Sequence, residues 1–401
     1  MHEVMEKESI RKDLVIIADD YPSLGRPVYT FIEQLAIALT EQGINIVIIA
    51  PQSITKSLFR STPLRPVLSL QETPSGKSIH IFRPKYITTG KYFQKFQHFV
   101  SRFKKKGIER VLNSFTSKNY ILYGHFWHNA IIVSDYAERN NVPLFVACGE
   151  GDDAMEVLAE NMPLTERYRI SKNITGVISV SSENKRKSID YKLINEDDVI
   201  VLPNSVNQTK FHKKIKKASR EKIGLDDSDF VVVFVGAFIY RKGSQRLAEA
   251  ISLINDDSIK TLFIGQPFPG DDYTPNCKGI HFMGVVEHNL LPDYLGAADI
   301  FVLPTLKEGC SNAIVEALAC GLPVISSNLP FNDDILDENN SIKIDPLNVK
   351  EIAEAILLLK NNEQLRLNLS ESALIRSKDL SIETRAKKII EFIRYQINKS
   401  H

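Results

Sequence analysis

The stretch DIFVLPTLKEGCSNAIVEALACGLPVI, residues 299–325, decides the fold of the half of the chain in which it lies. Its apolar run from Ile300 to Leu303 predicts a buried strand, a helical pattern starts at Ser311 or Asn312, and a second apolar run follows Gly321. A strand, loop, helix and strand in this order form the repeating unit of a parallel sheet. Because ligands of such sheets bind beyond the carboxyl ends of the strands, we expect functional residues in the loop after Leu303.

This loop and the helix after it offer groups that suit a nucleotide. The amides of the first helical turn form an anion site of the kind that binds a diphosphate. Glu308 lies in the loop, and Glu316 lies about a turn and a half inside the helix. Because helical side chains lean toward the amino end, the carboxylate of Glu316 can reach a ligand docked there. The alternative is that Glu308 is solvated and that Glu316 only meets a structural Lys or Arg.

Apolar runs alternate with helical patterns along the whole chain, which indicates parallel βαβ units in two doubly wound halves. The expected strands are Leu14–Ala18, Asn45–Ala50, Ile79–Phe82, Tyr120–Tyr123, Leu144–Ala147, Val177–Val180 and Val199–Leu202, then Phe230–Val235, Thr261–Ile264, Ile300–Leu303 and Val324–Ser326. The polar, lysine-rich stretch 210–220 indicates a linker, so the boundary is placed near Val206. We therefore expect a first domain at 1–205, a second at 206–378, and a final helix at 379–401 that packs back on the first.

Composition limits the class of protein. The 401 residues suit two domains, and 50 Lys plus Arg against 49 Asp plus Glu argue against a dedicated nucleic-acid binder. Residues 1–13 are charged, and no stretch approaches the ~20 apolar residues of a membrane span, so we expect no export signal and a cytoplasmic location. The four cysteines show no C-x-x-C pair, which favours buried thiols over a metal site.

The spacing of Glu308 and Glu316, flanked by Leu-Pro and Ala-Cys-Gly-Leu-Pro-Val-Ile, resembles glycosyltransferase family 4. Weaker features of that family are found at 203–207, 236–243 and 282–284. The resemblance implies the GT-B fold, with two Rossmann-like domains facing a central cleft and C-terminal helices crossing back. It also implies a retaining, hexosyltransferase-type transfer from a UDP- or GDP-sugar to a glycan or lipid-linked acceptor. In that family Glu308 would bind hydroxyls of the donor sugar and Glu316 the ribose, and the phosphates would meet the amides of Gly309, Cys310, Ser311 and Asn312.

A basic pair at the end of another expected strand completes the donor site that the resemblance implies. Arg241 and Lys242 follow the strand ending at Val235, where two cations can meet a leaving diphosphate. The family usually has an arginine at the position of Ala237, so Arg241 is the candidate substitute, and a solvated turn is the alternative. Gly284 is a further donor-site candidate. No cluster of acids is arranged for a metal, so we expect no metal and no cofactor.

The first half offers candidates for the acceptor site. His125 matches the family's cleft histidine and is assigned to catalysis, while His128 is assigned to acceptor binding or to structure. The loop at 149–154 formally matches a dinucleotide fingerprint, but its three acids would repel a pyrophosphate, so Glu150 and Asp152 are assigned to acceptor hydroxyls. Gly25 stands where the family keeps a glycine loop near the phosphates.

Residues 91–115 combine aromatic and basic residues at helical spacing. Phe93, Phe96, Val100 and Phe103 would share one face, with Lys91, Lys95, Arg102, Lys104, Lys105, Lys106 and Arg110 around them. Such a helix can rest on an anionic membrane surface, which would make the protein peripheral at the inner face of the cell membrane. The alternative is a core-facing aromatic stripe with a solvated basic face.

The sequence leaves two rival functions open. One is a sugar-nucleotide epimerase with the GT-B fold, and the other is a catalytically silent GT-B partner subunit. Transfer in cell-surface polysaccharide synthesis is the function that the resemblance favours.

Overall fold

The computed structural model describes residues 13–23, 28–60, 63–88, 97–151 and 153–399, which form two compact units. The first unit comprises the described residues of Met1–Val180, Asn184–Leu202 and Ala386–His401. The second comprises Ser181–Glu183 and Pro203–Arg385. Apart from the short segment Ser181–Glu183, the chain thus enters the second unit at Pro203 and returns to the first at Ala386.

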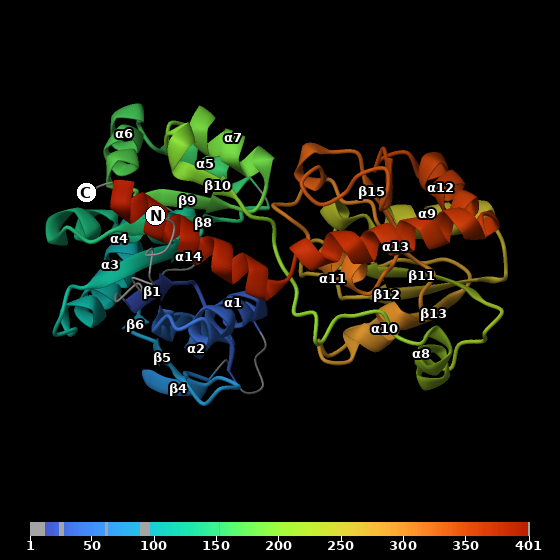
Figure 1. Cartoon of the computed structure of the whole chain (residues 1–401), viewed down its shortest axis with the longest axis horizontal. Helices are drawn as coiled ribbons and strands as arrows, with labels where there is room; N and C mark the ends of the chain where they lie inside the picture. Colours follow the sequence, from blue (N-terminus) through green and yellow to red (C-terminus); the bar gives the residue numbers. More distant parts are fainter. Residues whose placement is uncertain (1–12, 24–27, 61–62, 89–96, 152, 400–401) are drawn as a thin grey trace, which may run out of the picture. The chain divides into compact units, whose positions relative to one another are not determined.

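The first unit is built on an eight-stranded sheet, whose strands lie in the order β10-β9-β8-β7-β1-β2-β5-β4 (Figure 1). All pairings in it are parallel except that of β4 with β5. The strands are β1 (Asp13–Ile17), β2 (Ile46–Ile49), β4 (Leu68–Glu72), β5 (Ser78–Phe82), β7 (Tyr120–His125), β8 (Leu144–Cys148), β9 (Gly176–Ser179) and β10 (Val199–Val201). The central strands are nearly all apolar and buried, as expected when helices cover both faces. A short pair, β3 (Gln52–Ser53) and β6 (Lys85–Tyr86), lies outside this sheet.

Eight α-helices accompany the sheet of this unit within the described residues. They are α1 (Thr30–Glu41), α2 (Ile54–Arg60), α3 (Gln97–Asn113), α4 (Trp127–Asn140), α5 (Ala154–Asn161), α6 (Leu164–Asn173), α7 (Ser182–Asp190) and the C-terminal α14 (Ile382–Lys399). Helix α14, red in Figure 1, lies against the sheet because the Phe392 ring packs edge-on to that of Phe145, with centroids 6.2 Å apart. Gly176 permits this contact, since a Cβ there would stand 3.0 Å from both rings. The last helix is therefore part of the core of the first unit.

The second unit is a six-stranded parallel sheet in the order β13-β12-β11-β14-β15-β16. Its strands are β11 (Phe230–Val235), β12 (Ile259–Ile264), β13 (Ile280–Gly284), β14 (Ile300–Leu303), β15 (Val324–Ser327) and β16 (Ser341–Ile344). Its helices are α8 (Lys216–Ile223), α9 (Ser244–Ile254), α10 (Leu291–Ala297), α11 (Asn312–Ala319), α12 (Val349–Asn361) and α13 (Glu363–Asp379). Counted from β11, this is the order 3-2-1-4-5-6 of a doubly wound nucleotide-binding sheet. The expected α/β fold of two doubly wound parallel-sheet domains is confirmed.

The lysine-rich stretch that the sequence predicted as a linker belongs to the second unit. Four of its lysines reach partners far along the chain, at distances between 2.5 and 3.3 Å: Lys210 to His288, Lys213 to Ser370, Lys214 to Asp293 and Lys216 to Asp299. The linker interpretation is wrong, because side chains distant in sequence hold these lysines against α10, α13 and the start of β14.

Candidate active site

The two loops that carry the sequence-predicted donor residues leave neighbouring strands of the second unit. Strand order reverses between β11 and β14, which pair directly with each other. Residues 236–243 follow β11, and residues 304–311 follow β14. In an open α/β sheet this reversal opens the crevice in which ligands bind. The topology therefore places Arg241, Lys242 and Glu308 at one edge of the sheet.

The carboxylate of Glu308 lies within a cluster of donors. Its Oε1 accepts hydrogen bonds from Lys242 Nζ and from the Thr305 hydroxyl, the latter at 2.9 Å. Its Oε2 lies 3.5 Å from an Arg241 guanidinium nitrogen. The Glu308 side chain is only 9% exposed, against 18% for Lys242 and 34% for Arg241. The carboxylate therefore neutralises the two cations that were expected to meet a diphosphate.

Backbone contacts fix the two loops to each other. The Arg241 guanidinium donates to the Lys307 carbonyl, and the Leu306 amide donates to the Arg241 carbonyl at 2.8 Å. Gly243 has a φ of 80°, and a Cβ there would stand 2.5 Å from the Pro304 carbonyl oxygen. Only glycine allows this approach, so it sets the spacing between the cations and Glu308.

The loop after Glu308 leads directly into α11. The Ser311 hydroxyl caps the helix by accepting from the Ile314 amide at 3.5 Å, as the sequence predicted for Ser311 or Asn312. Gly309 and Cys310 are buried, and the Asn204 side chain donates to the Cys310 carbonyl at 2.8 Å. The amides at the start of α11 therefore lie close in sequence to Glu308 and face the same edge of the sheet, where they can bind an anion.

Glu316 forms a contact that the sequence did not predict. Its Oε1 lies 2.8 Å from Nε2 of His288, and Nδ1 of His288 lies 2.9 Å from Nζ of Lys210. His288 belongs to the loop that follows β13, three residues before α10. Gly284, the last residue of β13, accepts from the Gly265 amide at 2.8 Å and thus ends that strand beside β12.

The strand order of the first unit also reverses, between β1 and β7, and charged residues follow there. Asp19, two residues beyond β1, accepts from Lys104 Nζ at 2.8 Å and lies 2.6 Å from Nε2 of His128. Burial acts to raise the pKa of Asp19, but the hydrogen bonds and charges of His128 and Lys104 outweigh it and hold the pKa below its ordinary value. His128 therefore contacts a carboxylate, that of Asp19, which the sequence did not predict as its partner.

His125 ends β7 among aromatic rings and is 8% exposed. Its ring packs edge-on against Phe31 and Phe126, with centroid distances of 5.3 and 4.6 Å. Phe126 has φ 72° and ψ 152°, a backbone conformation that residues other than glycine rarely adopt. Such strain costs on the order of 1–3 kcal/mol and is common at functional sites. The turn presents His125 and His128 on either side of Phe126, whose ring stacks on that of His128.

The other residues assigned to the first half differ in their placement. Glu150 is buried, and its Oε1 accepts from the Trp127 amide at 2.7 Å, so it caps the start of α4 and has little surface for an acceptor. Burial raises the pKa of Glu150 above its ordinary value. Gly25 and Asp152 lie outside the described residues, as do Lys91 to Phe96 of the expected basic helix.

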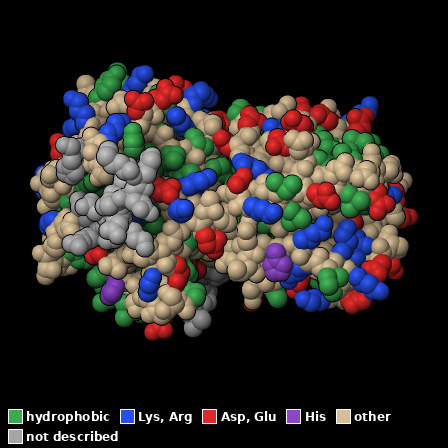
Figure 2. All heavy atoms as spheres, viewed as in Figure 1, with side chains coloured by type: hydrophobic (Ala, Val, Ile, Leu, Met, Phe, Trp, Pro, Cys, Tyr) green, Lys and Arg blue, Asp and Glu red, His purple; other side chains and the backbone are tan. Residues whose placement is uncertain are grey.

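The basic helix forms as α3, and its cations divide into two sets. Lys104 pairs with Asp19, and Lys105 pairs with Asp135 at 2.5 Å. Exposed basic residues follow at intervals of four, which places them on one face: Arg102, Lys106 and Arg110. Phe103 beside them is 39% exposed. On the face drawn in Figure 2, basic and acidic side chains are interspersed over both units.

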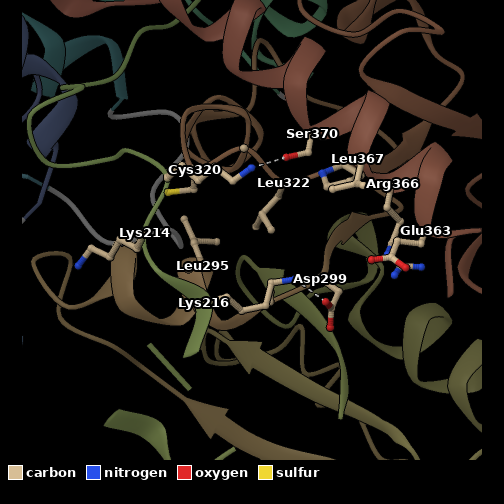
Figure 3. A pocket seen from close by; sticks show the side chains of 15 residues that line it. Lys214, Lys216, Leu295, Asp299, Cys320, Leu322, Glu363, Arg366, Leu367 and Ser370 are labelled. Atoms are coloured by element: carbon tan, nitrogen blue, oxygen red, sulfur yellow. Dashed lines mark hydrogen bonds and ion pairs between the residues drawn. The ribbon is translucent and has the colours of Figure 1, made fainter. Parts of the chain in front are cut away.

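A cavity of about 150 Å³ lies in the second unit but on the other edge of its sheet (Figure 3). Leu295 and Asp299 precede β14, and Leu322 precedes β15, so the cavity lies at the amino ends of these strands. Its lysines are largely paired, Lys216 with Asp299 in the view of Figure 3. We therefore place the candidate site at the carboxyl ends, where Glu308 lies, and not in this cavity.

Within the part of the chain that the structure describes, no three His, Cys, Asp or Glu side chains gather as metal ligands, and no helix is long and apolar enough to cross a membrane. Three of the four cysteines, Cys148, Cys310 and Cys320, are buried free thiols, and Cys277 is partly buried.

Comparison with known proteins adds to this geometry. Residues 229–362, which include both loops and α11, match the family "Glycosyl transferases group 1". The protein is a glycosyltransferase. Over 357 residues this glycosyltransferase is 26% identical to TuaC of Bacillus subtilis, a glycosyltransferase provisionally assigned to teichuronic acid biosynthesis, and the match covers 85% of this chain and 87% of that protein.

Two further similarities extend the comparison of this glycosyltransferase. It is 28% identical over 212 residues to the UDP-Gal:alpha-D-GlcNAc-diphosphoundecaprenol alpha-1,3-galactosyltransferase of Escherichia coli, covering 49% of this chain and 54% of that protein. Its structure resembles the sucrose-phosphate synthase of Thermosynechococcus elongatus with a TM-score of 0.77 and 17% identity, over 97% of this chain and all of that one. The structural likeness shows that the glycosyltransferase has the GT-B fold.

Proposed function

We propose that this glycosyltransferase moves a sugar from a UDP- or GDP-sugar to a glycan or lipid-linked acceptor in the synthesis of a cell-surface polysaccharide. The observation that carries the proposal is the cluster of Glu308 with Lys242, Arg241 and the start of α11. It combines a carboxylate, two cations and helix amides at the strand reversal of a nucleotide-binding sheet. The names of the two relatives described above, one acting on a UDP-sugar and a lipid-linked acceptor, support the substrate class.

In this proposal the donor lies along the edge of the second unit. Glu308 accepts hydrogen bonds from the sugar hydroxyls, and Glu316 accepts from the ribose hydroxyls. Lys242, Arg241 and the amides of residues 309–312 bind the diphosphate and stabilise its charge as it leaves. His125 and His128 of the first unit are assigned to the reacting sugar and the acceptor.

The transfer is proposed to retain the configuration of the sugar. The bond from the anomeric carbon to the phosphate oxygen breaks, the acceptor oxygen bonds to the same face, and its proton passes to the leaving phosphate. This route needs no protein nucleophile, which accords with the pairing of Glu308 to two cations. Because those cations and the helix amides meet the leaving charge, we propose that no divalent metal is needed.

The protein is further proposed to work at the cytoplasmic face of the membrane, with the exposed face of α3 against anionic lipid. Arg102, Lys106 and Arg110 are suited to this, since each basic residue near such a surface contributes about 1 kcal/mol. The acceptor's lipid carrier would then lie within reach of the first unit.

A panel of nucleotide sugars tests the function. A true donor at a hundred times its Kd should add about 2.7 kcal/mol to the free energy of unfolding, which a thermal shift detects. With a lipid-linked or glycan acceptor present, nucleoside diphosphate should be released in step with product. Conversion of the donor sugar without any acceptor would indicate an epimerase, and a chain that binds no nucleotide sugar would be a silent subunit.

A further inference from the structure

Glu316 is held from behind by a chain of two side chains. The His288 imidazole lies between the carboxylate and an ammonium group, with 2.8 Å from Nε2 to Glu316 and 2.9 Å from Nδ1 to Lys210. The three residues come from different parts of the second unit: the segment after Val206, the loop after β13, and α11. Glu316 is 14% exposed and His288 30% exposed, so the pair is partly shielded from water.

These contacts determine where the protons lie. A lysine ammonium can only donate, so Nδ1 of His288 must accept and carries no hydrogen. The ring proton is then on Nε2, where it points at Glu316. Phe211 packs against the ring with centroids 5.2 Å apart, and together with the two hydrogen bonds this contact limits the ring's rotation. His288 is thus a neutral donor of fixed direction.

This arrangement gives the two carboxylate oxygens of Glu316 different surroundings. Oε1 receives the histidine hydrogen bond, and within the described residues no other side chain bonds to the carboxylate. Oε2 is left to accept from a ligand at the start of α11. A carboxylate held by one oxygen presents the other in one direction, which reduces the entropy lost when a ligand binds.

We propose that His288, supported by Lys210, is a positioning residue that fixes Glu316 for the ribose hydroxyls and so sets the preference for ribonucleotides over deoxyribonucleotides. The inference rests on the proposed function, in which Glu316 binds the ribose. His288 itself touches no substrate in this arrangement and acts through Glu316.

The test compares the binding of two ligands that differ only in the ribose. Calorimetry first identifies which of uridine, guanosine and adenosine diphosphate binds the wild-type chain most tightly. The Kd of that compound and of its 2′,3′-dideoxy analogue are then measured for each variant, and their ratio gives the discrimination. We expect the wild-type ratio to be about tenfold or more, because the dideoxy analogue lacks the hydroxyls that would donate to the charged carboxylate of Glu316.

His288→Ala should reduce this ratio at least fivefold through weaker binding of the ribonucleotide, with the dideoxy Kd unchanged. His288→Gln, which keeps a donor toward Glu316, should restore most of it, and Lys210→Met should reduce it less than His288→Ala does. His281→Ala is the matched control: His281 also makes a hydrogen bond in this unit, but its partner is the backbone carbonyl of Ile223 at the end of α8, at 2.7 Å, and not Glu316. It should leave the ratio unchanged.

The outcomes separate the two ideas. If His288→Ala weakened both ligands equally, or left the ratio intact while Glu316→Ala abolished it, the positioning role would be overturned and the ribose role of Glu316 would stand. If Glu316→Ala kept the wild-type ratio, or if none of the three diphosphates bound, both the proposed donor site and the positioning role of His288 would be refuted.

Discussion

Removal of the Glu308 side chain should affect the binding of the intact donor and of free nucleoside diphosphate differently. Glu308→Ala takes away the carboxylate that neutralises Lys242 and Arg241 in the free protein. In the proposed binding mode the intact donor then loses its sugar contact, whereas free nucleoside diphosphate meets two cations whose charge Glu308 no longer neutralises. The same substitution should therefore weaken binding of the intact donor but not binding of the nucleoside diphosphate.

The magnitudes follow from the contacts. Loss of one charge-assisted hydrogen bond to the sugar, about 1.5–3 kcal/mol, lowers kcat/KM roughly ten- to a hundredfold. At the 3.5 Å between Arg241 and Glu308, Coulomb's law with an effective dielectric of 20 gives about 5 kcal/mol before desolvation and rearrangement. If about 1 kcal/mol of this survives, nucleoside diphosphate binds about fivefold more tightly to the variant.

The assay is calorimetry of nucleoside diphosphate and of the intact donor, together with initial rates. Glu308→Gln removes the charge but keeps an acceptor for Thr305. It should therefore keep its affinity for nucleoside diphosphate and lose less affinity for the intact donor than Glu308→Ala does. Asp293→Ala is a matched control, since it breaks ion pairs with Lys214 and Lys222 elsewhere in the unit.

Each variant must first unfold cooperatively, because breaking a largely buried pair can cost about 3–5 kcal/mol. If folded Glu308→Ala lost as much affinity for nucleoside diphosphate as Glu316→Ala does, the assignment of Glu308 to the sugar and of Glu316 to the ribose would be refuted.

Four other outcomes are expected. Glu316→Ala should weaken nucleoside diphosphate and intact donor alike, about ten- to a hundredfold by calorimetry; a loss confined to the donor would place the ribose elsewhere. Asp19→Asn should lower the free energy of unfolding by about 2 kcal/mol at pH 7. Because the folded pKa of Asp19 is depressed, the difference from wild type should begin to shrink as the pH falls below about 4 in denaturant titrations and should continue to shrink as the pH falls further; a difference independent of pH would contradict the ion-pair account. Replacing Arg102, Lys106 and Arg110 together with Glu should reduce binding to anionic vesicles more than tenfold without changing donor affinity, and unchanged vesicle binding would remove α3 as the contact. Transfer should continue in excess chelator, so activity that is abolished there and restored by magnesium or manganese would show that a metal is required.

The fold could be predicted where strands are continuous apolar runs. The strands expected at Tyr120, Leu144, Phe230 and Ile300 all form there. The edge strand β4 was missed, because its residues alternate between exposed and partly exposed and its sequence LSLQE has no apolar run. Burial on both faces, which produces the apolar signal, is absent at a sheet edge.

The site was predictable in so far as it is local in sequence. Glu308, Ser311 and Glu316 belong to one strand-loop-helix unit, so their spacing alone places them. The partners that only the sheet brings together were not found: His288 is 28 residues from Glu316, and Asp19 is 109 residues from His128. For Asp19 a signal existed, since an acid directly after the first strand of a doubly wound sheet lies at its carboxyl edge.

The return of the chain to the first unit through α14 has a consequence for biosynthesis. The face of β8 and β9 that Phe392 covers stays open until the ribosome has added residues 203–385, which at 5–20 residues per second takes about 10–40 s. During that interval the second unit can fold while the first still exposes apolar surface at Phe145. A fragment ending near Leu202 would therefore keep this apolar face exposed, and such a surface makes a partly folded chain prone to aggregation.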